Sequence, residues 1–103
     1  MPTLNLASSV LSEIQSVLAR VAPQVEVWAY GSRVKNFSHE GSDLDLVIRN
    51  VTHLEEKSTL VPVIKRALQE SQCPILVDVM DWASLPVTYR QEIEKEYVVI
   101  QDV

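Results

Sequence analysis

Hydrophobic residues recur at helical spacing in three segments of the 103-residue chain. The first segment covers residues 6–21, where the apolar positions fall on one stripe and Pro23 ends the pattern. The second covers residues 59–69, unless a capping-box pattern that starts at Thr52 begins the helix earlier. The third opens at residues 84–86, because proline favours the first turn of a helix. We therefore predict three amphipathic helices.

Three shorter segments are rich in β-branched and other apolar residues, which is typical of strands. They cover residues 25–30, 43–48 and 75–80, and Gly31 breaks the first of them. The apolar tail at residues 97–100 is too short to count as an element of its own. The order helix, strand, strand, helix, strand, helix predicts an α/β (α+β) fold in which helices pack against a small mixed β-sheet.

Length and composition restrict the possible classes of protein. With 103 residues, 47% of them hydrophobic, the chain is expected to form one domain over residues 1–103. The net charge of −5, from 14 acidic and nine basic residues, does not favour unaided binding to nucleic acid. No apolar run approaches the roughly 20 residues that span a bilayer, and the lone Cys73 fits a reducing compartment. We therefore expect a cytoplasmic protein that binds neither a membrane nor, directly, nucleic acid.

Asp43 and Asp45 lie two residues apart on a predicted strand, so their carboxylates face the same way, about 6.5–7 Å apart. A pair at that separation can hold two divalent cations about 3.5–4 Å apart, the spacing used in phosphoryl and nucleotidyl transfer. A calcium loop needs further oxygen ligands at alternate positions, but Val47 and Arg49 follow here. The simpler alternative, a solvated strand face, stays open from these two residues alone.

Other positions in the chain could complete such a site. Gly31 directly follows a strand and lets the backbone approach a ligand, while Ser32 offers a hydroxyl beside free N–H groups, which suits a phosphate. An ordinary helix cap is the alternative there. Asp78 lies in an apolar run that we expect to be buried, where a carboxylate is costly unless it is paired or bound to metal. Asp81 faces the opposite side, and we expect it to be a cap or a surface acid.

Together, these motifs resemble the signature of the polymerase-β-like nucleotidyltransferase superfamily. The signature combines Gly31-Ser32, a spacer of ten residues, Asp43-x-Asp45 and a later strand carboxylate, here Asp78. The short chain and its stretch from Val27 to Arg33 are similar to the smallest members, the MNT proteins often encoded beside HEPN-domain toxins. Members often continue Gly-Ser-Arg-Ala-Arg-Gly, whereas this chain ends the motif with Lys35-Asn36, so that Lys35 keeps the positive charge.

The resemblance implies that the chain uses ATP as substrate together with Mg²⁺, most simply as two ions. Asp43 and Asp45 would ligate both ions. Asp78 would complete the ion that activates the attacking hydroxyl, and would act as general base. Contacts to the nucleotide and its phosphates would come from Gly31, Ser32, Arg33, Lys35 and Ser42.

The acceptor of the nucleotide is expected to be a protein. Larger relatives carry additional domains that bind the acceptor, and 103 residues leave no room for one. We expect an antitoxin that transfers AMP to a tyrosine hydroxyl of a partner HEPN ribonuclease toxin. Two alternatives stay open. One is a binding module that neutralises its partner by occlusion, using the apolar tail at residues 97–100 and an exposed sheet edge. The other is a small-molecule adenylyltransferase that acts as a homodimer.

Overall fold

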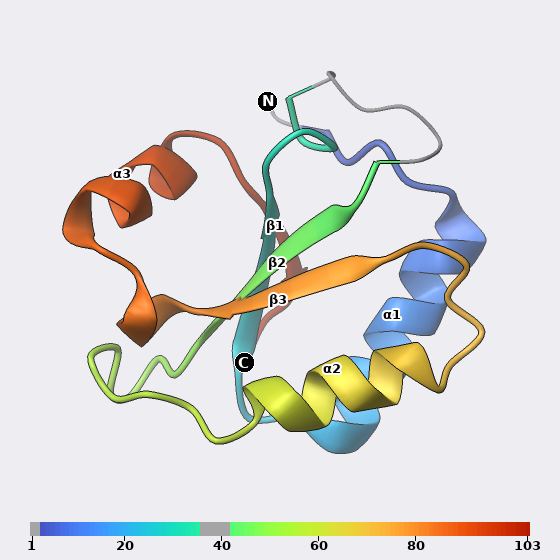
Figure 1. Cartoon of the computed structure of the whole chain (residues 1–103), viewed down its shortest axis with the longest axis horizontal. Coiled ribbons are helices and arrows are strands. Elements are labelled where there is room, and N and C mark those ends of the chain that lie inside the picture. Colours follow the sequence, from blue (N-terminus) through green and yellow to red (C-terminus); the bar gives the residue numbers. More distant parts are fainter. Residues whose placement is uncertain (1–2, 36–41) are drawn as a thin grey trace.

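A mixed four-stranded sheet forms the centre of the protein (Figure 1). The computed structural model describes residues 3–35 and 42–103. Their strands are arranged β3-β2-β1-β4, with β2 and β3 parallel and the other neighbours antiparallel. The predicted fold class, helices packed against a small mixed sheet, is confirmed. In chain order the elements are α1 (Ser8–Val21), β1 (Glu26–Tyr30), β2 (Leu44–Arg49), α2 (Val61–Gln69), β3 (Val77–Asp81), the short 3-10 helix η1 (Trp82–Ser84), α3 (Val87–Lys95) and β4 (Val98–Gln101).

The predicted helices and strands are present, with ends that differ by a few residues. The second helix begins at Val61, so the alternative start at Thr52 is wrong, and residues 50–60 form turns and extended chain instead. Pro62 lies in the first turn of α2, where its missing N–H costs no hydrogen bond. Asn36 lies outside the described residues. No helix within the described ranges is both long and apolar enough to cross a membrane.

The apolar tail is a strand of the sheet, so the prediction that it is too short to be an element is wrong. β4 pairs antiparallel with β1, and Ile100 enters the core with 6% exposure. The side-chain amide of Gln101 donates to the carbonyls of Ala22 and Val25, each at 2.8 Å. Four residues suffice because β1 already offers a rigid edge to pair with, which no local sequence pattern reveals.

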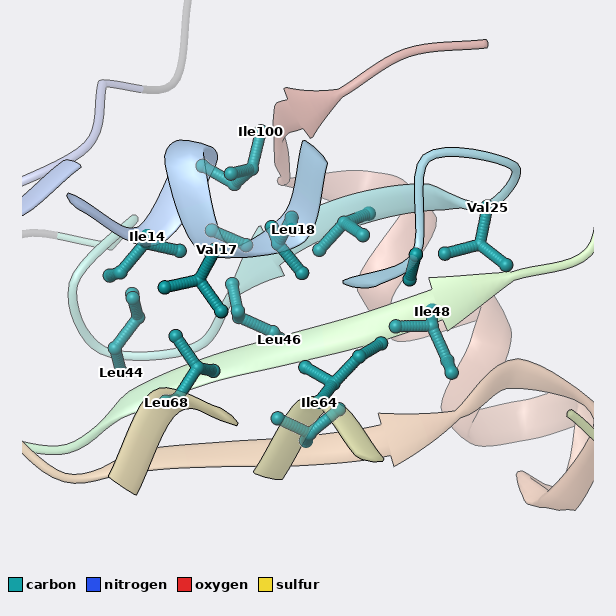
Figure 2. Close-up of a cluster of buried hydrophobic side chains, with 14 of the residues drawn as sticks. Ile14, Val17, Leu18, Val25, Leu44, Leu46, Ile48, Ile64, Leu68 and Ile100 are labelled. Atoms are coloured by element: carbon teal, nitrogen blue, oxygen red, sulfur yellow. The ribbon is translucent and has the colours of Figure 1, made fainter. Parts of the chain in front are cut away.

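Helices α1 and α2 cover one face of the sheet (Figures 1 and 2). The predicted alternation along β2 is confirmed, since its even-numbered hydrophobic residues all face these helices. Each fully buried aliphatic side chain contributes about 1.5–3 kcal/mol, so this layer fixes the backbone whose other face bears the polar residues. The buried side chains of the layer include Ile14, Val17, Leu18, Leu44, Leu46, Ile48, Ile64 and Leu68.

The opposite face carries an aromatic cluster beside η1 and α3. Tyr97 stacks on Trp28 with ring centroids 3.8 Å apart. The Arg49 guanidinium lies 3.9 Å from the ring centroid of Trp28 and 4.7 Å from that of Trp82, and it pairs with Glu26. Trp28 and Trp82 are both buried, as predicted for packing residues. The cluster fills the face beside the C-terminal half of β2 and leaves the N-terminal half for polar groups.

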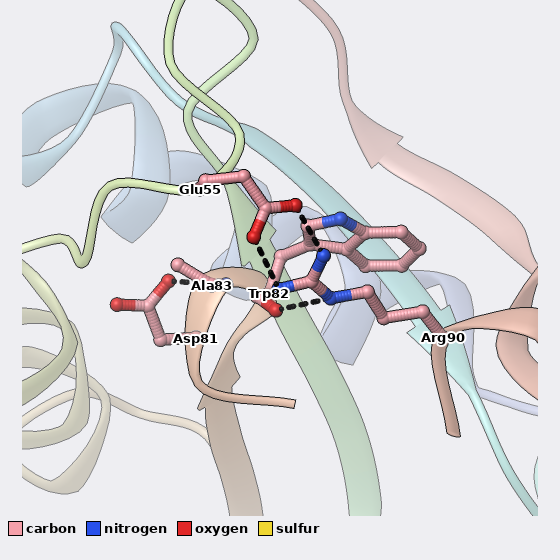
Figure 3. Close-up of polar contacts among 5 residues, drawn as sticks. All are labelled: Glu55, Asp81, Trp82, Ala83 and Arg90. Atoms are coloured by element: carbon pink, nitrogen blue, oxygen red, sulfur yellow. Dashed lines mark hydrogen bonds and ion pairs between the residues drawn. The ribbon is translucent and has the colours of Figure 1, made fainter. Parts of the chain in front are cut away.

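Polar contacts fix η1 and α3 to the loop that precedes α2 (Figure 3). Arg90 of α3 donates to the Trp82 carbonyl at 2.9 Å and forms an ion pair with Glu55 at 2.5 Å. Asp81 caps η1 by accepting from the backbone N–H of Ala83, and also accepts from that of Ser58 at 2.6 Å. The prediction that Asp81 is a cap is therefore confirmed. These contacts hold α3 in a fixed position beside the polar end of the sheet.

Candidate active site

Three carboxylates come together on the sheet face opposite α1 and α2. Asp45 of β2 is paired in register with Asp78 of β3 on one side and with Tyr30 of β1 on the other. Neighbouring strands lie about 4.8 Å apart, so the two side chains are adjacent on this face. Asp43 precedes β2 and is two residues from Asp45, which puts it on the same face. The sheet therefore brings Asp43, Asp45 and Asp78 together on one face, as the sequence predicts.

The exposure of Asp78 differs from the prediction. Asp78 is exposed, although its apolar run was expected to bury it, because β3 is an edge strand and its neighbours Val77 and Val79 turn toward the helices instead. Asp43 is also exposed, and only Asp45 is half-buried. The energetic argument from a costly buried carboxylate therefore applies to Asp45 and not to Asp78.

Electrostatics at Asp45 reflect this crowding of negative charge. Burial raises the pKa of the Asp45 carboxyl above its usual range, and the charges of Asp78 and Asp43 raise it further. Within residues 3–35 and 42–103, none of the ion pairs involves any of the three carboxylates. The cluster thus holds negative charge that a bound cation would relieve.

Divalent cations suit this set of donors. Mg²⁺ usually takes one or two protein carboxylates and fills its other positions with water and substrate phosphate oxygens. Among the described residues, no three His, Cys, Asp or Glu side chains already surround a single cation position. The carboxylates therefore fit an ion that arrives with a phosphate-bearing substrate, and not one enclosed by protein ligands alone.

Gly31 lies against the central carboxylate. Its φ is +82°, a left-handed conformation that residues with side chains rarely adopt. A Cβ added there would come within 2.4 Å of Oδ2 of Asp45. The turn that follows is a single helical turn, in which the N–H groups of Val34 and Lys35 donate to the Gly31 carbonyl at 3.0 and 3.2 Å. The absence of a side chain thus allows the start of this turn, with Ser32, to approach the carboxylate.

Arg33 and Ser42 join the turn to the start of β2. The Arg33 side chain is 6% exposed, and its guanidinium donates to the Ser42 carbonyl at 2.9 and 3.1 Å. It also donates to the Asn5 carbonyl at 2.7 Å, while the Asn5 N–H donates to the Arg33 carbonyl at 2.8 Å. Lys35, by contrast, is exposed. The buried arginine therefore braces the segment that carries Asp43, whereas the exposed lysine can turn toward a ligand.

A cavity of about 250 Å³ opens beside the carboxylates, between the end of β1 and α3. The rings of Tyr30 and Tyr89 meet edge to face with centroids 6.3 Å apart. Burial raises the pKa of the Tyr30 hydroxyl, and the neighbouring Tyr89 and the charge of Asp45 add to the effect. The lining of the cavity consists of Tyr30, Gly31, Lys35, Asp45, Tyr89, Glu92, Ile93 and Glu96.

The polar residues that line this cavity from α3 and from its C-cap, Glu96, were not predicted from the sequence. Tyr89, Glu92 and Glu96 recur at helical spacing, which is the only local signal they give. That spacing is equally typical of any solvated helix face. Their position beside Asp45 depends on how α3 packs on the sheet, and this follows from distant contacts such as that of Arg90 with Glu55.

Three comparisons with known proteins point to the same kind of domain. Residues 2–96 match the family described as "Poly(A) RNA polymerase, mitochondrial-like, central palm domain". The chain is 38% identical over 99 residues to the "Probable protein adenylyltransferase MntA" of Haemophilus influenzae, covering 96% of this chain and 85% of that protein. A solved structure described as "Crystal structure of the toxin-antitoxin with AMP-PNP" superposes with a TM-score of 0.69 over 90% of this chain and 73% of the other. At 16% identity, that likeness demonstrates a shared fold.

Proposed function

The chain belongs to the MNT-type nucleotidyltransferases, which have the polymerase-β-like palm domain, and from this premise we propose that it transfers AMP from ATP to a hydroxyl of a partner toxin. The observation that carries the proposal is the row of Asp43, Asp45 and Asp78 beside the turn at Gly31-Ser32. Carboxylates next to a glycine turn provide, on one sheet face, sites for a metal-bound triphosphate and for an attacking hydroxyl.

The roles of the carboxylates follow from their positions. Asp43, Asp45 and Asp78 would hold Mg²⁺, which when bound neutralises the triphosphate and polarises its α-phosphate. Asp78, which is exposed on edge strand β3, meets an incoming acceptor and takes the proton from its hydroxyl. The acceptor oxygen forms a bond to the α-phosphorus, the bond from that phosphorus to the α–β bridging oxygen breaks, and pyrophosphate leaves.

The phosphates bind on the side of the three carboxylates that is nearer to β1. Gly31 and Ser32 present backbone N–H groups and a hydroxyl to the β- and γ-phosphates. Lys35, exposed at the end of the same turn, neutralises charge on the leaving pyrophosphate. Arg33 acts mainly by holding Ser42, which keeps Asp43 in place relative to the turn. The cavity under Tyr89 adjoins Gly31 and Asp45, so it takes the nucleoside part of the substrate.

The acceptor that we propose is a tyrosine hydroxyl of a HEPN ribonuclease toxin, so that the chain acts in the cytoplasm as an antitoxin. Two similarities support a protein acceptor and a toxin partner. The Haemophilus influenzae relative is named a protein adenylyltransferase, and the structural neighbour is a toxin–antitoxin complex with an ATP analogue.

We expect a HEPN protein to be encoded beside the gene of this chain, and the proposal is tested with that protein. The purified pair is incubated with ATP and Mg²⁺, and the intact mass of the toxin is followed. We expect additions of whole adenylate units that disappear with EDTA and in the double variant Asp43→Ala, Asp45→Ala. Asp102→Asn, which removes an exposed carboxylate from the C-terminal tail, is the matched control and should leave the transfer unchanged. An unmodified toxin in the wild-type reaction would refute the proposed activity.

A second function has one observation in its favour. β4 is an edge strand of uncharged residues with Val99 45% exposed, an edge to which another chain could add. If occlusion alone neutralises the toxin, the double variant of Asp43 and Asp45 still suppresses its ribonuclease activity at equimolar ratio. If catalysis is required, the double variant loses suppression, whereas a Val99→Lys variant of the edge keeps it.

A further inference from the structure

The direction from which the acceptor approaches follows from the order of the strands, and this inference rests on the proposed function. In nucleotidyl transfer the attacking and leaving oxygens lie roughly in line through the phosphorus. The phosphate-binding turn at Gly31 lies at the end of β1, on one side of Asp45. The leaving pyrophosphate therefore lies toward β1, and the acceptor oxygen must come from the β3 side, past Asp78.

Leu76 is the exposed hydrophobic residue on that side. Its side chain is 74% exposed, more than any other large hydrophobic side chain of the described residues. Its carbonyl accepts from the N–H of Leu44 at 3.0 Å, which extends the pairing of β2 and β3 by one residue and places Leu76 beside Asp43. Being two residues before Asp78, it faces the same side of the sheet, about 6.5–7 Å along the strand. A large aliphatic group is thus exposed to water next to the carboxylates of Asp43 and Asp78.

A groove of about 270 Å³ adjoins Leu76 at the outer edge of the sheet. One wall comes from the C-terminal half of α2 and the other from the segment that leads into β3, which Figure 1 shows at the sheet margin. Its surface combines the aliphatic groups of Leu68, Ile75 and Val77 with the charged Lys65. The groove reaches the edge of β3 from the α2 side and Leu76 lies at its rim, so an exposed leucine and a groove with aliphatic groups adjoin at this edge, which is the kind of surface that partner proteins cover.

The main chain of β3 offers a further means of attachment. β3 is at the end of the strand order, and β2 is the one strand of the described sheet that pairs with it. Its outer N–H and C=O groups are available to an extended segment of another chain. Such a segment would run directly beside Asp78.

We propose that Leu76, the outer edge of β3 and the adjoining groove form the docking surface for the acceptor protein. The occupant is a polypeptide segment that packs a large apolar side chain on Leu76 and delivers its target hydroxyl to Asp78. The exposed Asp43 and Asp78 repel acidic neighbours, so the segment carries no carboxylate next to that hydroxyl. Docking on the groove leaves the nucleotide cavity beside α3 uncovered, so the two substrates bind independently.

The lone cysteine reports directly on this groove. Cys73 is the single cysteine of the chain, is half-buried and lines the groove, so its alkylation by N-ethylmaleimide measures access there without any substitution. The alkylation rate is read from the intact mass of this chain. We expect the HEPN toxin to slow it several-fold, and AMP-PNP with Mg²⁺ to leave it unchanged. An alkylation rate that saturating toxin does not alter would overturn the proposed docking surface.

A substitution tests whether Leu76 contributes to recognition of the acceptor. Leu76→Ser removes an exposed side chain, so folding is preserved, and should raise the KM for toxin about tenfold or more. The KM for ATP and the kcat at saturating toxin should not change. Val63→Ser is the matched control, since Val63 is 46% exposed on α2 but lines a separate hollow with Arg20 and Val21, and it should behave as wild type. Equal effects of the two substitutions, or a change in kcat alone, would overturn the role of Leu76.

The two proposals fail in different ways. If toxin protects Cys73 but receives no adenylate, the docking surface stands and the proposed activity fails. If toxin is adenylated while Cys73 stays fully reactive and Leu76→Ser has no effect, the activity stands and the docking surface fails.

Discussion

Replacing Gly31 with alanine tests the closest contact in the candidate active site. The new Cβ would lie 2.4 Å from Oδ2 of Asp45, well below van der Waals contact, and 3.3 Å from the carboxylate carbon. The backbone there has a φ of +82°, which costs an L-residue about 1–2 kcal/mol by itself. Either the carboxylate or the turn must move to relieve the overlap. We expect the free energy of unfolding of Gly31→Ala to fall by about 1–3 kcal/mol.

A double-mutant cycle separates the two causes. In an Asp45→Ala background the carboxylate is absent, so the Gly31→Ala substitution should cost the backbone strain alone. The assay is urea denaturation of the wild type, both single variants and the double variant, all in EDTA. We expect a coupling free energy of at least about 0.5 kcal/mol between the two positions. In the Asp45-containing protein, binding of AMP-PNP with Mg²⁺, followed by calorimetry, should also weaken because the carboxylate is displaced.

Additivity of the two substitutions, within about 0.3 kcal/mol, would refute this reasoning. It would mean that the turn at Gly31 and the Asp45 carboxylate do not touch, and the phosphate and metal subsites would then lie further apart than proposed. A cost for Gly31→Ala near zero would likewise contradict the left-handed backbone at this position.

Three further substitutions test other parts of the structure. Asp45→Asn should abolish transfer yet raise the free energy of unfolding of the metal-free protein, by less than about 1 kcal/mol because partial exposure screens the repulsion. Since the folded-state pKa of Asp45 is raised, this gain should be present near pH 7, shrink in urea titrations as the pH falls through the raised folded-state pKa, and be absent below the ordinary aspartate pKa of about 3.9, where the carboxyl is protonated in both states. Arg33→Lys cannot reach both the Ser42 and Asn5 carbonyls, so its thermal unfolding should reveal a loss of about 1–3 kcal/mol; equal stability would contradict the brace. Ile100→Ala should cost about 2–5 kcal/mol in urea titrations, and a cost below that of the exposed control Val99→Ala would mean that β4 is not part of the core.

Much of the fold could be predicted because its elements carry local patterns. The alternation of Leu44, Leu46 and Ile48 gave both the strand and the face on which Asp43 and Asp45 lie. The spacing of apolar residues also gave α1 and α2, since the helices bury a stripe against one sheet face. Wherever a single element has one buried side, its sequence contains enough information to orient it.

The remaining features depend on pairing between distant segments. Asp78 is exposed because its strand lies at the sheet edge, and the position of a strand in the sheet order is not encoded in its own residues. The buried role of Arg33 depends on a carbonyl of Asn5, 28 positions away. The cavity beside Tyr89 depends on the packing of α3. Each of these required knowledge of which segments meet in space.

The pairing of β4 with β1 has a kinetic consequence. The paired residues are about 70 positions apart in the chain, so this contact closes a long loop and adds to a high contact order. Until it forms, β1 has a free edge that includes the apolar Val27, Trp28 and Ala29, which makes the partly folded chain prone to association. With only four residues, β4 is also the strand that we expect to detach first in native-state hydrogen exchange, ahead of β1 and β2. Because β4 would pair last during folding and detach first from the native sheet, this one short strand would govern the folding rate. It would also determine where proteases first gain access to the protein.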